Sequence, residues 1–579
     1  MIGEKSVLAD HDKRRTLYPV PKRPNAAGNI LKEVFSMKKI VALLLVLAML
    51  LAMGSMALAA DKVTYYVRGG TAEYEPYIYP GLVGLLKIQE MADVEIDWTV
   101  VCGNGDEIHA QYLSMLSSGK YPDIIQWQHN NDYVGGVSQL YNDGIIIELN
   151  DVIDKYMPNY KALLEAHPEV AKTLKDDEGR YLYFTVINPL STPDEKVAAT
   201  WWGLQGRKDW MENVGIEELP TTIDGWYEML VAFRDLDPNG NGEQDEIPFD
   251  AGQNGLVYFM PAYDIVNGAY INPDTGKVGF GEYTQNYKEY LETMNKWYSE
   301  GLIKDIWLED GSIATATEKD SDIYADLAGS WMGLSNYWEQ RLPQVLEKNP
   351  NADFVSYPWV EDAQGRVYAC DYNIGYGDRY TACISVDCKN VEAAARLIDA
   401  MYTEEGTNCT TWGIVDGDPI LTSREDTAWT QGNGTYTVDE NGVKHETEWA
   451  NKMTENFYDG AFANKYRYAM SHVSFPRWGA GDYLAATREQ RYVDSCKLWA
   501  SADNGLEYPA AIVLSVDAQK AAAPQLDDIN SYIAEMTKKF ISGDEPLTNF
   551  DNYLDQLQKM GMEDLIAAYQ AAYDSFMAR

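Results

Sequence analysis

The segment VTYYVRG (residues 63–69) begins a run in which apolar stretches alternate with stretches of helical period. VEIDWTVV (94–101) and PDIIQW (122–127) follow it, and all three are rich in the β-branched and aromatic residues that favour strands. Helices are predicted between them, near Gly81 to Met91 and near Ile108 to Ser118. Strands that alternate with helices form a parallel sheet covered by helices, so this run predicts an α/β fold.

A further helix is predicted after Thr221 and Thr222, which are candidate N-caps. Its apolar face has the spacing i, i+3, i+4, i+7 and consists of Trp226, Met229, Leu230 and Phe233. Another helix is predicted at 527–542, with Gly543 as its candidate C-cap.

The chain is too long for one hydrophobic core, because single cores stop growing at roughly 250 to 300 residues. The sequence contains no tandem repeat and no long low-complexity linker. We therefore predict two lobes that share one discontinuous chain through short crossovers. The first lobe is predicted to comprise approximately 60–190 and 375–435, and the second approximately 191–374 and 436–579.

The N-terminal region contains a candidate export signal, MKKIVALLLVLAMLLAMGSMALA (37–59). Two lysines, an apolar run and small residues before Ala60 are in the order of a secretory signal peptide. The apolar run at 40–53 is shorter than the roughly 20 residues that a membrane-spanning helix needs. We interpret residues 1–36 as a non-native upstream extension. The mature chain is expected to be secreted, without the lipid anchor that a cysteine near Ala60 would carry.

The composition limits the possible partners. The formal net charge is −42, and such a surface repels nucleic acid and anionic lipid. The six cysteines show no CxxC or Cys/His spacing typical of zinc, and their low density leaves both disulfides and buried thiols open. A metal site would therefore have to use oxygen ligands.

A candidate calcium loop, DLDPNGNGEQDEIPF (235–249), follows the Trp226 helix. Calcium takes six to eight oxygen ligands, and alternating Asp and Asn in a glycine-rich turn present such oxygens. An EF-hand register from Asp235 to Glu246 also fits except at Gly242, but we prefer the register that begins at Asp237. The alternative is a loop of Asx turns beside the helix. The predicted ligands of a structural Ca²⁺ are Asp237, Asn239, Asn241, the backbone carbonyl of Glu243, Asp245 and Glu246.

Several stretches resemble extracellular solute-binding protein family 1 of carbohydrate ABC importers, which has the alginate-binding subgroup as its calcium-containing example. They occur in the order and spacing of that family and span essentially residues 62–579. They are PDIIQWQHNNDYVGG (122–136), RKDWMENVGIEELPTTIDGWYEMLVAFRDLDPNGNGEQDEIP (207–248), WYSEGLIKD (297–305), CKNVEAAARLIDAMYTEEG (388–406), WGIVDGD (412–418) and YLDQLQKMGMEDLIAAYQAAYDSF (553–576). The resemblance implies a two-lobed periplasmic-binding-protein-like fold of type II, with a hinge and a ligand cleft between the lobes.

A sugar presents apolar C–H faces and a ring of hydroxyl groups, so its site needs aromatic platforms with polar side chains at their edges. The carboxyl end of the PDII strand (122–125) is the edge where such sheets bind ligands, and Trp127, His129, Asn130 and Asn131 follow it. The resemblance adds four candidates: Trp201 and Trp202 near the first crossover, Trp331 after a strand end, and Trp412 before a glycine. Arg477 and Trp478 are candidates because the proline and glycines around them predict a loop. The alternative for each ring is packing in a core.

The resemblance implies a secreted, monomeric, non-catalytic protein that captures a sugar or oligosaccharide and delivers it to the permease subunits of an ABC-type importer. The alternative is a secreted glycoside hydrolase or lyase, because two carboxylates across a cleft suffice for sugar cleavage. No GxSxG, HExxH, P-loop or dinucleotide fingerprint is present. Binding is therefore the preferred hypothesis.

Overall fold

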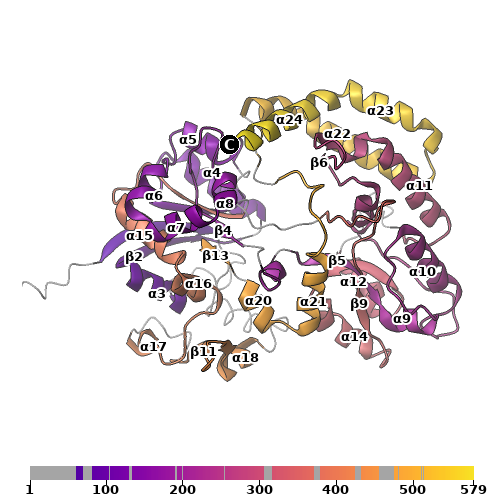
Figure 1. Ribbon diagram of the computed structural model, residues 1–579, viewed down its shortest axis with the longest axis horizontal. Coiled ribbons are helices and arrows are strands. Elements are labelled where there is room, and N and C mark those ends of the chain that lie inside the picture. The colour runs from indigo at the N-terminus through magenta and orange to yellow at the C-terminus, as the bar shows by residue number, and fades with distance from the viewer. Residues whose placement is uncertain are drawn as a thin grey trace, which may run out of the picture. The chain divides into compact units, whose positions relative to one another are not determined.

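The computed structural model of the protein (Figure 1) covers most of the chain after the predicted leader. The described residues are 60–68, 81–103, 105–129, 133–188, 192–198, 200–252, 254–305, 316–370, 379–423, 432–454, 475–479, 481–509, 512, 514 and 516–579. The predicted upstream extension and signal peptide lie outside these ranges, as do Asn130 and Asn131.

A four-stranded sheet with the order β10-β3-β1-β2 organises the first lobe. Its strands are β1 (Asp61–Arg68), β2 (Val94–Val101), β3 (Ile124–His129) and β10 (Arg379–Ile384). β1 pairs in parallel with both β2 and β3, which confirms the parallel sheet predicted from the alternating pattern. β10 comes from much later in the chain and pairs antiparallel with β3.

Two helices connect the parallel strands, α3 (Val83–Ala92) and α4 (Gly105–Ser117), close to their predicted positions. α4 buries a face made of Ile108, Tyr112 and Leu116, whose spacing of four residues repeats along one side of a helix. The other elements that follow in this lobe are α5 (Gly136–Asn142), α6 (Asn150–Tyr156), α7 (Pro158–Ala166), α8 (Pro168–Thr173), β4 (Val186–Ile187), α15 (Val391–Met401), α16 (Glu404–Thr411) and α17 (Ile420–Ser423).

The second lobe contains a three-stranded sheet with the order β8-β5-β9. Its strands are β5 (Trp202–Arg207), β8 (Ser330–Leu334) and β9 (Phe354–Ser356), and both pairings are antiparallel. Glycines let neighbours approach this sheet closely: a Cβ at Gly203 would lie 2.1 Å from a ring atom of Trp499.

α10 (Ile223–Asp235) is the helix predicted after the two threonines. Thr222 is its N-cap, because its side-chain oxygen accepts a hydrogen bond from the backbone N–H of Gly225 at 3.1 Å. The predicted apolar face is confirmed, since all four of its residues are buried: Trp226, Met229, Leu230 and Phe233.

Helices and a small hairpin complete the part of this lobe that bears on the site. The hairpin strands are β6 (Ala269–Ile271) and β7 (Val278–Phe280), flanked by the 3₁₀ helices η4 (Gly255–Tyr263) and η5 (Gly281–Tyr283). The helices are α11 (Gln285–Ser299), α22 (Val516–Ser542), α23 (Phe550–Lys559) and α24 (Met562–Ala578), with η7 (Leu547–Asn549) before α23. α22 packs against α11 (Figure 1), begins before the predicted 527, and is followed by Gly543 at φ 83°.

The remaining elements are short. They are η3 (Glu195–Ala198), α9 (Lys208–Asn213), α12 (Ala316–Tyr324), α13 (Tyr337–Gln340), α14 (Leu342–Leu346), β11 (Tyr436–Val438), β12 (Lys444–Glu446), α18 (Glu448–Thr454), β13 (Arg477–Trp478), α20 (Gly481–Thr487) and α21 (Gln490–Trp499).

Two large hydrophobic cores underlie the two sheets. One draws its residues from Val63 to Ile187, from Ala382 to Leu421, and from Phe475. The other draws them from Leu204 to Ala369 and from Trp499 to Leu565. Each core therefore combines segments that are distant in sequence, while the lobe boundaries given above remain a prediction.

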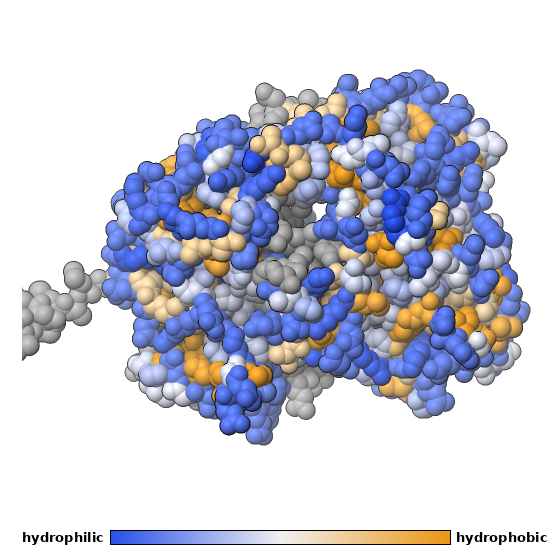
Figure 2. All heavy atoms as spheres, viewed as in Figure 1, coloured by the Kyte–Doolittle hydropathy of each residue, from blue (hydrophilic) through white to orange (hydrophobic). Residues whose placement is uncertain are grey.

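Hydrophilic side chains cover most of the face seen in Figure 2, as the acidic composition requires. Within the described residues, no helix is long and apolar enough to cross a membrane. None of the six cysteines, all of which the structure describes, forms a disulfide, and three of them are buried: Cys383, Cys409 and Cys496. The structure thus decides between the two cysteine states left open by the sequence.

Candidate functional site

Trp127 lies within β3, directly opposite Thr381 of β10, rather than beyond the end of the strand. Its ring stacks on Tyr112 of α4, with centroids 4.0 Å apart and an angle of 10° between the planes. Only 5% of the residue is exposed, so its ring belongs to the first core. His129 is the last residue of β3, but its side chain, like Asn130 and Asn131, lies outside the described part of the chain.

Two other tryptophan candidates are also packed among aromatic rings. Trp331 was expected after a strand end, but it lies within β8 opposite Gln205 and is fully buried. Alternation along β8 directs this side chain into a core, where its ring lies 4.9 Å from that of Phe354. Trp412 is 4% exposed and packs edge-on against Tyr483.

Arg477 and Trp478 were expected on a loop, but they form the short strand β13, which pairs in parallel with β4. β4 supplies the backbone partners that let this proline- and glycine-flanked segment extend. Arg477 is 4% exposed, and its Nε donates to the carbonyl of Gly479 at 3.1 Å. The half-buried ring of Trp478 lies 4.5 Å from the ring of His167.

Trp202 is the first residue of β5 in the second lobe, and Trp201 directly precedes the strand. Trp201 is 36% exposed, and its carbonyl accepts a hydrogen bond from Ser335 at 2.7 Å. Trp202 is half-buried and lines a hollow of about 620 Å³. Other residues that line this hollow are Asn254, Tyr258, Asn267, Glu507 and Tyr508.

This first hollow has the chemistry of a sugar site. Its aromatic rings offer apolar platforms, while the exposed amides of Asn254 and Asn267 can both donate and accept hydrogen bonds. Its volume falls within the roughly 300 to 1,000 Å³ typical of ligand pockets. Of the predicted ligand residues that the structure describes, Trp202 lines it; the other lining residues gave no periodic signal in the sequence.

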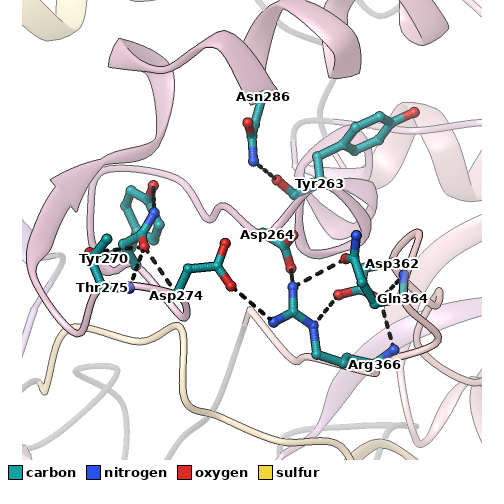
Figure 3. A network of polar contacts seen from close by, with 10 residues as sticks. Tyr263, Asp264, Tyr270, Asp274, Thr275, Asn286, Asp362, Gln364 and Arg366 are labelled. Atoms are coloured by element: carbon teal, nitrogen blue, oxygen red, sulfur yellow. Dashed lines mark hydrogen bonds and ion pairs between the residues drawn. The ribbon is translucent and has the colours of Figure 1, made fainter.

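Arg366 holds the two ends of the segment from Asp264 to Asp274 (Figure 3), and Asn267 belongs to this segment. The guanidinium of Arg366 pairs with Asp264 at 2.7 Å, before Asn267, and with Asp274 at 3.5 Å, after it. It also pairs with Asp362 on its own turn. Asp264 occupies the left-handed region at φ 58°, where the chain leaves η4. The segment between Asp264 and Asp274 is therefore tied down at both ends.

The same network changes the ionisation of its carboxyl groups. Burial and the facing carboxyl group of Asp362 raise the pKa of Asp264 to about 6, although Arg366 opposes this shift. Burial also acts to raise the pKa of Asp362, but hydrogen bonds from the backbone N–H and guanidinium of Arg366 lower it. Asp362 thus accepts the hydrogen bonds that favour its charged form, whereas Asp264 is protonated more readily.

The candidate calcium loop begins directly after α10 and turns sharply. Asp237 has φ 47°, and Gly240 and Gly242 have φ 71° and 81°, so three residues adopt the left-handed conformation. The side-chain oxygen of Asn239 accepts the N–H of Asn241 at 3.0 Å, and that of Asn241 accepts the N–H of Glu243 at 2.6 Å. The Asx turns of the alternative interpretation are therefore present, but they use only one lone pair of each oxygen.

Three carboxylate oxygens in this loop are buried and accept no hydrogen bond: Oδ1 of Asp237 and both Oε atoms of Glu246. Burial raises the pKa of Glu246, and the carboxylates of Asp237 and Asp245 raise it further. Buried unpaired carboxylates are costly, and a cation would satisfy them. Across the described residues, no cluster of three or more His, Cys, Asp and Glu side chains could hold a metal ion, so a site here depends on the Asn and backbone oxygens as well.

Comparison with known proteins agrees with this architecture. The fructooligosaccharide ABC transporter substrate-binding protein FusA of Streptococcus pneumoniae is 27% identical over 514 residues, which cover 85% of this chain and 87% of FusA. A solved structure of a FusA EF-hand mutant in complex with fructo-nystose gives a TM-score of 0.63 at 22% identity and covers 90% of this chain and 100% of that one.

Two other solved structures share the fold. A human-milk-oligosaccharide-binding solute-binding protein of Bifidobacterium longum infantis gives a TM-score of 0.68 at 18% identity, covering 89% of this chain and 99% of that one. The alginate-binding protein AlgQ2, solved without calcium ion, gives 0.62 at 17% identity, covering 90% and 99%. At these identities the likeness concerns the fold, and it confirms the two-lobed α/β class predicted above.

The family model described as bacterial extracellular solute-binding protein matches residues 87–408, more than half of the chain. The match extends from α3 in the first lobe, across the sheet of the second lobe, to α16 in the first lobe again. It favours binding over the hydrolase alternative, because members of this family capture solutes rather than transform them. The chain belongs to the bacterial extracellular solute-binding protein family.

Proposed function

We propose that this protein captures an oligosaccharide outside the cytoplasm and delivers it to the permease subunits of an ABC-type importer. The observation that carries the proposal is the hollow in the second lobe. Trp202 and Tyr508 bring half-buried aromatic rings to its lining, next to Asn254 and Asn267, whose amides match sugar hydroxyls. The names of the relatives support the substrate class, since FusA is named for fructooligosaccharides.

For the other candidates whose side chains the structure describes, the exposure of the side chain decides whether we propose ligand contact. The rings of Trp201 and Trp202 are accessible enough to contact a sugar, and Trp478 is half-buried. His129, Asn130 and Asn131 stay in the proposal as contacts from the first lobe. Burial favours a packing role for Trp127, Trp331 and Trp412, and a positioning role for Arg477.

The proposal includes a structural Ca²⁺ in the 237–246 loop. Asp237 and Glu246 supply the buried oxygens without hydrogen bonds, and Asn239, Asn241, Asp245 and the carbonyl of Glu243 would complete the shell. Because the loop packs beside α10, the ion would stabilise the second lobe rather than contact sugar. The EF-hand of the FusA structure supports the presence of such an ion in this family.

Isothermal titration of the purified protein with oligosaccharide series tests the proposed function. The series are fructo-, malto- and xylo-oligosaccharides and oligogalacturonides, with two to six residues each, in buffer that contains calcium. We expect one-to-one saturable binding to one series and no cleavage product by chromatography after incubation. Cleavage of the bound sugar would establish the hydrolase or lyase instead, and absence of binding to every series would refute the carbohydrate class.

A further inference from the structure

A second hollow, of about 440 Å³, lies in the same lobe between the β6–β7 hairpin, α11 and α22. Tyr287 and Tyr290 of α11 and Asn530 and Ala534 of α22 line it, together with Glu282. Asn530 and Ala534 are exposed, so this hollow opens to solvent along α22. Its volume also falls within the range typical of ligand pockets.

Glu282 provides a buried acceptor in the second hollow. The residue is 3% exposed, and both of its carboxylate oxygens share the backbone N–H of Gly268, at 3.3 and 3.0 Å. A carboxylate has about four acceptor positions, so most of its acceptor capacity is unused by this N–H. None of the described residues that line the hollow carries a positive charge. Burial accordingly raises the pKa of Glu282 to about 7.

The two hollows adjoin each other. Four residues line both of them: Asn254, Val257, Asn267 and Ala269. Tyr508 of the first hollow also packs edge-on against Tyr569 of the second, with centroids 5.2 Å apart. A polymer held in the first hollow therefore needs only to pass Asn254 and Asn267 to reach the second.

We propose that the second hollow is a further sugar subsite, in which Glu282 accepts hydrogen bonds from the hydroxyls of a residue further along the captured oligosaccharide. This inference rests on the proposed capture of an oligosaccharide and specifies its length: the preferred ligand is long enough to occupy both hollows. Hydrogen bonds from hydroxyls would supply the donors that the buried carboxylate lacks, and the tyrosine rings would pack on the sugar face.

Binding in this mode also couples to protons. Hydroxyl donors stabilise the ionised carboxylate, so the ligand lowers the pKa of Glu282 and releases protons near pH 7. The titratable groups that face Glu282 are Tyr287, Tyr290 and Tyr553, and burial keeps the pKa of each well above neutrality. They stay protonated in this range, so the released proton belongs to Glu282.

The test compares short and long ligands on the full protein. Ala534→Trp fills the second hollow from its exposed rim, and Ser531→Trp places the same ring on an exposed position of α22 that does not line the hollow. The probes are the disaccharide and the hexasaccharide of the fructo-, malto- and xylo-oligosaccharide and oligogalacturonide series, measured by titration calorimetry. We expect Ala534→Trp to weaken hexasaccharide binding roughly tenfold or more, with little effect on the disaccharide. Ser531→Trp should change neither.

Glu282→Gln provides a second readout. The variant keeps an acceptor for Gly268, and it should abolish the proton release that titrations in buffers of different ionisation enthalpy measure for the hexasaccharide. Equal weakening of both ligands by Ala534→Trp, or unchanged proton release in Glu282→Gln, would overturn the subsite. If the wild type binds no oligosaccharide at all, the proposed function itself fails. A hexasaccharide that binds no more tightly than the disaccharide in the wild type would refute the subsite alone.

Discussion

Burial of Glu282 should make the stability of the second lobe depend on pH, and the substitution Glu282→Gln should remove this dependence. Its pKa is raised from 4.5 to about 7 in the folded protein because burial disfavours the charged form. Between these values the folded state binds more protons than the unfolded state, so stability falls as pH rises through this window. Below about pH 4.5 the carboxyl group is neutral in both states and contributes no such penalty.

The magnitude follows from the shift. One pKa unit corresponds to 1.36 kcal/mol, so at pH 8 the buried charge costs on the order of 3 kcal/mol of folding free energy. Glu282→Gln removes the charge and preserves the hydrogen bond from Gly268, because the amide oxygen of Gln accepts it. We therefore expect the difference in unfolding free energy between the variant and the wild type to change between pH 4.5 and pH 8. The change should favour the variant at pH 8 by on the order of 3 kcal/mol.

Urea unfolding followed by tryptophan fluorescence measures this difference at the two pH values. Glu289→Gln, at an exposed carboxylate on the neighbouring α11, is the matched control and should show no such pH-dependent gain. A Glu282→Gln variant whose stability difference from the wild type is the same at pH 4.5 and pH 8 would refute the reasoning.

Three further predictions concern the site and its support. Chelation of calcium by EDTA should lower the melting temperature and leave sugar affinity nearly unchanged. Glu246→Gln should reduce this response to EDTA. An unchanged melting temperature of the wild type in EDTA would contradict the calcium site. Trp202→Ala should cost about 1 to 3 kcal/mol of oligosaccharide affinity by analogy with stacking on other ring ligands, and an unaltered titration would remove Trp202 from the site. Arg366→Met should speed hydrogen exchange at Gly268, whose N–H donates to Glu282, because the segment between Asp264 and Asp274 loses its ion pairs; unchanged protection would show that the segment is held by other contacts.

The fold class could be predicted from the sequence because it depends on local periodicity. The alternation from residue 63 to 127 placed β1, β2 and β3 and the helices between them. The face of α10 and its cap at Thr222 followed from spacing and side-chain chemistry alone. These features are encoded within about fifteen residues, so no distant contact was needed to infer them.

The site could be predicted only in part. Trp127 and Trp331 were chosen for their proximity to strand ends, but both rings are buried because strands pair further along the chain than the sequence indicated. The loop at 237–246 was recognised from its oxygen-bearing residues, while the unpaired oxygens of Asp237 and Glu246 emerged only from folding.

The sequence by itself determined the α/β class, the resemblance to solute-binding proteins and the candidate calcium loop, since each rests on a local pattern. Only the tertiary structure decided which aromatic rings remain accessible and that Glu282 lies in a hollow beside the one lined by Trp202. The physical reason is that burial and ionisation depend on segments that meet from distant positions, such as 254–269, 280–290 and 526–541. No periodicity within any one of these segments specifies what the others place against it.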